Sequence, residues 1–144
     1  MDTNPRPDGR RVLIVDDDAT VRDIVAAVAA MDGWSAVHAS SGGEALRLLR
    51  EAPTSFALVV TDVDMPGGGG FELMEAARRS GLRLPFVVMS GSPQWRGPAS
   101  EKGALRFMAK PFRLTELRAA LRMAVPPTAA DGPATWPPAH TDGE

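Results

Sequence analysis

The chain has 144 residues, of which 44% are hydrophobic and 24% are charged, and its formal net charge at pH 7 is −2. That length favours a single domain with its own core, and no cluster of Lys or Arg indicates a nucleic-acid surface. The absence of cysteine excludes disulfides, thiolate catalysis and zinc–cysteine sites. Because no apolar run approaches the roughly 20 residues of a membrane span, we expect a cytoplasmic protein that contacts neither membrane nor nucleic acid.

The first half of the chain alternates short apolar runs with helical periodicity. Residues 12–15 are apolar at every position, which predicts a buried strand that ends at a run of three acids. Residues 35–39 predict a second strand, and residues 42–52 predict the helix that follows it. The helix between these two strands ends at Gly33, and its expected core face consists of Val21, Ile24, Val25 and Val28.

The third strand carries the residue on which the functional argument rests. Residues 57–60 are apolar throughout and predict a strand covered on both faces, which delivers the carboxylate of Asp62 to its end. Met65, Pro66 and four glycines then prevent the strand from continuing. In isolation, an acid before such a turn also fits a plain turn residue. The other strand ends therefore decide the interpretation.

The second half of the chain continues the alternation. Strict alternation of five strands with helices predicts an α/β fold, a doubly wound parallel sheet with helices on both faces. The alternation alone does not determine the strand order. The remaining expected elements are a helix over residues 71–80, a strand over residues 86–89 that ends at Ser90, a strand over residues 105–109 that ends at Lys110, and a final helix marked by Leu114, Leu117 and Leu121.

Composition changes at both ends of this region. Residues 1–10 are polar, and residues 126–144 are rich in Pro, Ala, Thr, Gly and Asp without helical periodicity. Such segments bury too little apolar surface to offset the entropy lost on ordering. We therefore expect one domain over residues 11–125, between two disordered ends.

Polar groups follow four of the five predicted strands. Asp16 and Asp17 follow the first strand, and Asp62, Ser90 and Lys110 end the third, fourth and fifth. Because parallel strands direct their carboxyl ends to one edge of the sheet, these groups are expected to meet there. Oxygen ligands without His or Cys favour Mg²⁺, which leaves room for phosphate oxygens. The set predicts phosphoryl transfer to Asp62, with Lys110 and Ser90 contacting the phosphoryl oxygens.

Four short motifs stand in order along the chain: Val-Asp-Asp-Asp after the first strand, Asp-x-x-Met-Pro after the third, a hydroxyl residue after the fourth, and Lys-Pro-Phe after the fifth. In this combination the chain resembles the receiver domain of bacterial two-component response regulators. The resemblance covers residues 11–125. It implies a flavodoxin-like sheet in the strand order 2-1-3-4-5, and we expect a stand-alone receiver that signals by protein contact alone.

The resemblance also implies roles for individual residues. Asp16 and Asp17 would hold Mg²⁺ together with Asp62 and the backbone carbonyl of Asp64. Asp62 would accept a phosphoryl group from a phosphohistidine of a histidine kinase or a histidine phosphotransferase. Lys110 would pair with that group, and the family usually holds the peptide bond between this lysine and the following proline in cis.

The same resemblance extends to the output of the domain. Ser90 and Phe107 match the hydroxyl and aromatic residues that switch a protein-interaction surface toward a downstream protein target, which the sequence does not identify. The domain would catalyse only its own phosphorylation and dephosphorylation. It would therefore not be an enzyme that acts on other substrates.

Simpler interpretations of single residues stay open. Asp18 fits an exposed helix cap better than a third metal ligand, because carboxylates favour the start of a helix. Taken alone, Ser90 fits a turn at a strand end and Lys110 fits a solvated cation. Phe107 fits the core as well as it fits a switch.

Two functions from other classes use the same residue types. Asp62-Val63-Asp64 resembles the nucleophile motif of haloacid-dehalogenase-type phosphatases, but in those enzymes the metal-binding acids follow the nucleophile, and here they precede it. A phosphorylation-independent interaction module would lack an acid, the nucleophile or the lysine, and none of these is missing.

The segment between Ser90 and Phe107 departs from the family pattern. A proline fits only the first turn of a helix, so a helix that begins at Pro98 would have about one turn before Gly103 ends it. A short or irregular fourth helix is therefore expected. Trp95 would then lie in a loop, where its ring either packs onto Phe107 or the final helix, or anchors a partner as part of the output face.

Overall fold

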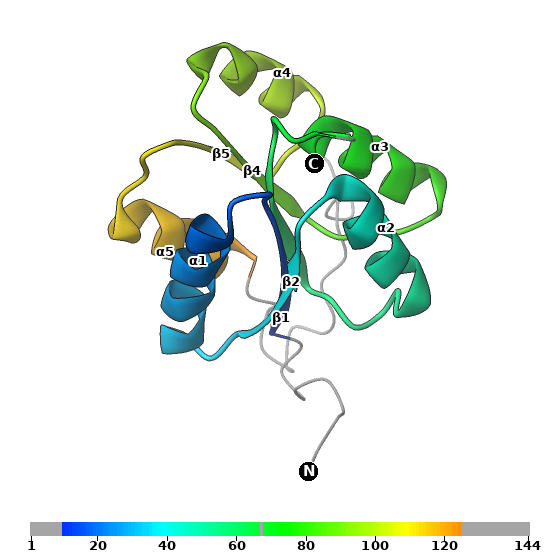
Figure 1. Cartoon of the computed structure of the whole chain (residues 1–144), viewed down its shortest axis with the longest axis horizontal. Helices are drawn as coiled ribbons and strands as arrows, with labels where there is room; N and C mark the ends of the chain where they lie inside the picture. The colour runs from blue at the N-terminus through cyan, green and yellow to red at the C-terminus, as the bar shows by residue number, and fades with distance from the viewer. Residues whose placement is uncertain (1–9, 67, 125–144) are drawn as a thin grey trace, which may run out of the picture.

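The computed structural model describes residues 10–66 and 68–124 of the chain (Figure 1). The two ends predicted to be disordered lie outside the described residues, apart from Arg10, so those predictions stay untested. In chain order the elements are β1 (Arg11–Val15), α1 (Ala19–Met31), β2 (Ser35–Ala39), α2 (Gly42–Glu51), β3 (Leu58–Asp62), α3 (Gly70–Arg79), β4 (Phe86–Ser90), the 3-10 helix η1 (Pro93–Trp95), α4 (Arg96–Glu101), β5 (Arg106–Ala109) and α5 (Leu114–Met123).

The strands form one parallel sheet in the order β2-β1-β3-β4-β5. This confirms both the predicted fold class and the strand order implied by the resemblance. The register pairs Val15 with Thr61 and Ser90 with Ala109. The residues that end β1, β3, β4 and β5 therefore lie along one edge of the sheet.

Helices cover both faces of the sheet, with α1 and α5 on one face and α2 and α3 on the other (Figure 1). Successive residues of β1 point to opposite faces. Val12 and Ile14 pack in the core under α1 and α5, whereas Leu13 and Val15 pack in the core under α2 and α3. Every residue of β3 and β4 is buried, which explains why these two sequences are continuously apolar over most of their length.

The buried face of α1 differs from the predicted face at one position. Val25 and Val28 are buried as expected, but Ile24 is 46% exposed. Neighbouring residues of a helix point about 100° apart. The buried face of α1 consists of Val25, Val28 and Ala29, and Ile24 lies at the margin of that face.

The segment after β4 contains the short fourth helix that the sequence predicts. α4 has only six residues, and the 3-10 helix η1 leads into it. The helix begins at Arg96 rather than at Pro98, which is a correction of the expected start. Pro98 is tolerated because it occupies the first turn, where backbone N–H groups have no intrahelical acceptor.

Among the helices of the described ranges, none combines the length and apolar character needed to cross a membrane.

Candidate functional site

Three carboxylates meet at the carboxyl edge of the sheet. One oxygen from each of Asp16, Asp17 and Asp62 lies within 4.8 Å of the others. Asp16 and Asp62 are buried, and Asp17 is exposed. Asp18 turns away from this group and caps α1, where its side chain accepts a hydrogen bond of 2.9 Å from the backbone N–H of Thr20. The predicted acids therefore come together, and Asp18 takes the helix-cap position.

Hydrogen bonds of both the side chain and the backbone fix the position of Asp16. Its Oδ1 accepts a hydrogen bond of 2.9 Å from the backbone N–H of Asp18, and its own N–H donates to the Ala39 carbonyl at 3.1 Å. Arg22 Nη1 donates to the Asp16 carbonyl oxygen at 2.6 Å. Arg22 is not on the core face predicted for its helix, and helical periodicity gives no signal that its side chain reaches back to Asp16.

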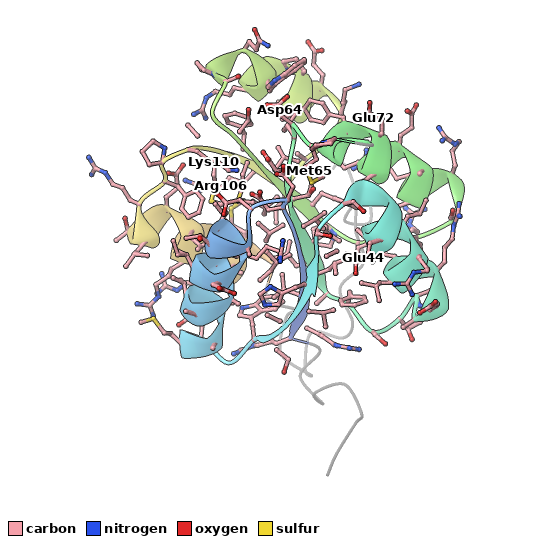
Figure 2. All side chains as sticks on the ribbon, in the orientation of Figure 1. Glu44, Asp64, Met65, Glu72, Arg106 and Lys110 are labelled. Carbon is pink, nitrogen blue, oxygen red and sulfur yellow. The ribbon has the colours of Figure 1, made fainter. Side chains whose placement is uncertain are left out.

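Lys110 supplies the positive charge of the site from the end of β5. Its Nζ lies 2.9 Å from Asp16 Oδ2 and 3.4 Å from Asp62 Oδ2. The peptide bond between Lys110 and Pro111 is cis, as the resemblance implies. Figure 2 labels Lys110 together with Asp64 near the end of the sheet where the carboxylates gather.

The electrostatics show a site that favours additional positive charge. Burial raises the pKa of the Asp62 carboxyl, an effect that the Lys110 ammonium opposes and the Asp16 carboxylate reinforces. Burial lowers the pKa of Lys110, but its bonds to Asp16 and Asp62 outweigh burial, so that the net pKa is raised. Lys110 is therefore charged at neutral pH, and the ionised form of Asp62 is disfavoured by its surroundings.

Ser90 ends β4 with its side chain fully buried. Its Oγ accepts a hydrogen bond of 2.9 Å from the backbone N–H of Ser92 and donates one of 3.2 Å to Oδ2 of Asp64. The resemblance implies a role only for the backbone carbonyl of Asp64. The sequence gives no signal for the hydrogen bond between the Asp64 side chain and Ser90, because it joins the end of β4 to the loop that follows β3.

Phe107 is a core residue of β5, and its side chain is 7% exposed. The Arg96 guanidinium lies over the ring, with its central carbon 4.9 Å from the ring centroid. Phe107 therefore occupies a core position in this structure.

The glycines after Asp62 allow α3 to begin directly against the end of β3. A Cβ on Gly70 would lie 2.5 Å from the Asp62 carbonyl oxygen, and a Cβ on Gly69 would collide with the Val63 carbonyl oxygen. The N–H of Gly69 donates to Oε1 of Glu72 at 3.0 Å, which fixes the start of the helix. The close backbone approach, and not only flexibility, requires glycine here.

Gly69→Ala is expected to lower the free energy of unfolding by about 2 kcal/mol or more, because the methyl group forces the backbone apart beside Asp62. Gly43→Ala is the matched control, since a Cβ at that position in α2 meets nothing within 4 Å. The control is expected to stabilise by about 0.5–1 kcal/mol. Urea unfolding of both variants checks the pair, and equal effects would contradict the close-approach argument.

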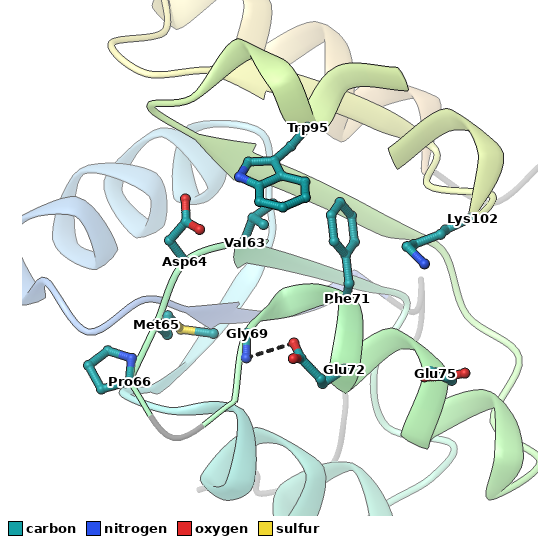
Figure 3. A pocket seen from close by; sticks show the side chains of 10 residues that line it. All are labelled: Val63, Asp64, Met65, Pro66, Gly69, Phe71, Glu72, Glu75, Trp95 and Lys102. Carbon is teal, nitrogen blue, oxygen red and sulfur yellow. Dashed lines mark hydrogen bonds between the residues drawn. The ribbon is translucent and has the colours of Figure 1, made fainter. Parts of the chain in front are cut away.

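A cavity of about 720 Å³ lies beside the site, between the β3–α3 loop and the segment around α4 (Figure 3). Trp95 lines it, half-buried, with its ring edge-on to Phe71 at a centroid distance of 5.8 Å. The expected packing onto Phe107 or α5 is replaced by this contact with α3. The other lining residues are Val63, Asp64, Met65, Pro66, Gly69, Glu72, Glu75 and Lys102.

The family described as "Response regulator receiver domain" matches residues 12–122. The chain belongs to this family. The two-component response regulator ARR12 of Arabidopsis thaliana is 35% identical over 114 residues, which cover 78% of this chain and 19% of that protein. The matched region thus spans about a fifth of the length of this curated relative.

Solved receiver structures have the same fold. Chemotaxis protein CheY4 of Vibrio cholerae is 29% identical, with a TM-score of 0.71 and coverage of 79% of this chain and 97% of that chain. Response regulator TrrA of Thermotoga maritima, solved in complex with Mg(2+)-BeF, is 24% identical with a TM-score of 0.72, covering 80% and 98% of the two chains.

Family membership identifies the chain as a signalling domain of two-component systems rather than a classical enzyme. This family membership argues against the haloacid-dehalogenase-type phosphatase that the motif Asp62-Val63-Asp64 also resembles. Asp16, Asp17 and Asp62 form the acidic pocket of this receiver domain.

Proposed function

We propose that this receiver domain is the phosphoacceptor of a phosphorelay, in which Asp62 takes a phosphoryl group from a phosphohistidine of a histidine kinase or histidine phosphotransferase. One observation carries the proposal. The Asp62 carboxylate ends a buried strand with the Lys110 ammonium 3.4 Å away and two further carboxylates beside it. A positioned nucleophile and a fixed cation are what phosphoryl transfer requires of a protein. Residues 11–125 form the functional unit in this proposal.

The donor set fits Mg²⁺, since the three clustered side chains offer only carboxylate oxygens and no nitrogen or sulfur. Asp16, Asp17 and Asp62, with the backbone carbonyl of Asp64, would hold the ion. When bound, it neutralises negative charge on the phosphoryl oxygens. The raised pKa of Asp62 agrees with this, because a buried carboxylate short of positive charge gains from a nearby cation.

The residues of the chain perform the transfer itself. An Asp62 oxygen attacks phosphorus, so that a new O–P bond forms while the N–P bond of the donor breaks and the imidazole leaves with that electron pair. Lys110 pairs with a phosphoryl oxygen and preserves the alignment of Asp62. The Ser90 hydroxyl donates to another phosphoryl oxygen. The domain acts only on itself, through this transfer and the later hydrolysis of its acyl phosphate.

Intact mass spectrometry after incubation with a phosphohistidine donor and Mg²⁺ tests the proposed function. We expect the addition of one phosphoryl group that hydroxylamine removes, as an acyl phosphate requires. Many turnovers of a small phosphomonoester would instead support a phosphatase.

The metal site gives a thermodynamic prediction. Mg²⁺ at about ten times its Kd is expected to stabilise the fold by about 1.4 kcal/mol, a rise in Tm of about 5 °C. Asp17→Asn should remove most of that rise. Asp18→Asn is the matched control, because it makes the same charge change one residue away and Asn also caps helices well. Thermal melts with and without Mg²⁺ measure the rise in Tm for each variant. An unchanged rise in the Asp17→Asn variant would exclude Asp17 as a metal ligand.

Ser90 and Phe107 are the proposed switch pair, and the surface near Trp95 is the proposed output face toward a downstream protein. Trp95 supports this role because its half-buried ring lines the cavity next to Asp64, and aromatic rings dominate binding hot spots. Phe107 lies in the core under Arg96, so the proposal requires its ring to move within packed surroundings.

Trp95 fluorescence is expected to respond to phosphorylation. With Trp34 and Trp136 replaced by Phe, the remaining emission should shift when Mg²⁺ and the phosphoryl mimic beryllofluoride are added, because the cavity beside Asp64 changes. The complementary control is Trp95→Phe, which retains the other two indoles and should give a constant spectrum. A constant Trp95 spectrum would remove this residue from the switching surface.

A further inference from the structure

The buried hydroxyl of Ser90 already donates a hydrogen bond in this structure. Its Oγ donates to the Asp64 carboxylate at 3.2 Å and accepts from the N–H of Ser92 at 2.9 Å. A serine hydroxyl has one proton to donate. While that proton serves Asp64, it cannot also serve a phosphoryl group on Asp62.

We propose that the Asp64 side chain is a positioning residue that restrains the Ser90 hydroxyl and competes with the phosphoryl group for its proton. The inference rests on the proposed function, since it assumes that Ser90 donates to a group bound at Asp62. Asp64 thereby favours the unphosphorylated state without touching phosphorus.

The burial of the two residues indicates which of them moves. Ser90 is fully buried on a central strand, whereas Asp64 is exposed in the loop that leads to α3. A buried hydroxyl needs a partner, and an exposed carboxylate finds water when it loses one. The exchange from Asp64 to a phosphoryl oxygen therefore leaves no buried group unpaired.

Two neutral substitutions separate the hydrogen bond from the charge. Asp64→Asn removes the charge but retains a side-chain oxygen that accepts from Ser90, whereas Asp64→Ala removes both. Comparing the alanine and asparagine variants cancels the effect of charge on an anionic ligand. The probe is beryllofluoride in saturating Mg²⁺, and its Kd is measured by calorimetry on the full chain.

In the alanine variant the buried hydroxyl lacks this acceptor until the probe arrives, so binding also relieves an unsatisfied donor. We expect Asp64→Ala to bind beryllofluoride about tenfold more tightly than Asp64→Asn. In a Ser90→Ala background the two substitutions should give equal Kd values within about twofold. The Kd for Mg²⁺ alone, which does not involve the hydroxyl, should be equal in the alanine and asparagine variants.

Equal beryllofluoride affinities of the two Asp64 variants in the Ser90 background would overturn the inference. So would a difference that persists after Ser90→Ala, since Asp64 would then act by another route. Failure of the wild-type protein to bind beryllofluoride would instead reject the proposed function, and the inference with it. Thermal melts of each variant verify that the fold is retained.

Discussion

Asp62→Asn is expected to abolish phosphorylation of the receiver domain. The Asn side chain has nearly the shape of Asp but is not a nucleophile that forms an acyl phosphate. Intact mass spectrometry with a phosphohistidine donor measures the loss. Asp23→Asn, on the exposed surface of α1, is the control that should take up one phosphoryl group as the wild type does. A phosphoryl adduct of equal yield on the Asp62 variant would refute the assignment.

The same substitution is expected to stabilise the metal-free protein at pH 7 by about 1 kcal/mol, a rise in Tm of about 4 °C. The reason is the raised pKa of Asp62, which means that the folded state disfavours the ionised carboxylate. The loss of folding stability caused by the ionised carboxylate is largest at pH values above the pKa of Asp62 in the folded state. It decreases as the pH falls toward 3.8, the pKa of an unperturbed Asp. Urea unfolding should therefore show a larger difference between variant and wild type at pH 7 than at pH 4.

Lys110→Met is expected to change two properties in opposite directions. The rate of phosphoryl transfer should fall by at least about 100-fold, because a fixed cation is lost from the phosphoryl oxygens. The affinity for Mg²⁺ should rise by about fivefold, because Nζ lies within 3.4 Å of two carboxylates that the metal would share. A variant that was merely misfolded would lose both properties.

The chain offers one matched control for this prediction, since Lys102 is its only other lysine. Lys102 is exposed, and its Nζ lies 5.5 Å from the centroid of the Phe71 ring. Lys102→Met should leave both the transfer rate and the Mg²⁺ affinity close to wild type. Quench-flow transfer kinetics and metal titration measure the four values. Weaker Mg²⁺ binding in the Lys110 variant would contradict the argument that Lys110 and the metal share the same two carboxylates.

The sequence predicted the parts of the site that depend on strand ends. Asp16, Asp62, Ser90 and Lys110 each follow an apolar run, and parallel topology is sufficient to bring the ends of such runs together. The strand order itself came from the resemblance, since β-α alternation is compatible with several orders. The predicted ranges 42–52 and 71–80 differ by one residue from α2 and α3 at helix ends, where Ala52, Gly69 and Ser80 are the cap residues.

The contacts between loops were not predictable from the sequence. The bond between Ser90 and Asp64 joins the last residue of β4 to the loop after β3, and its length depends on how these two strands are packed. Arg22 reaches the Asp16 carbonyl because of its rotamer, which helical periodicity does not specify. Trp95 of η1 packs edge-on against Phe71 of α3, a contact between two elements far apart in the sequence. Such details depend on tertiary packing rather than on local pattern.

The six-residue length of α4 has a consequence for local stability. A helix this short forms few internal hydrogen bonds, so it gains little from cooperative propagation. Its position depends on ties to neighbours, such as the bonds from the Arg78 guanidinium on α3 to the carbonyls of Lys102 and Gly103. Local opening of α4 would therefore cost much less than global unfolding. α4 follows Ser90 after the short 3-10 helix η1, so a small free-energy change at the site is sufficient to alter its population of open states.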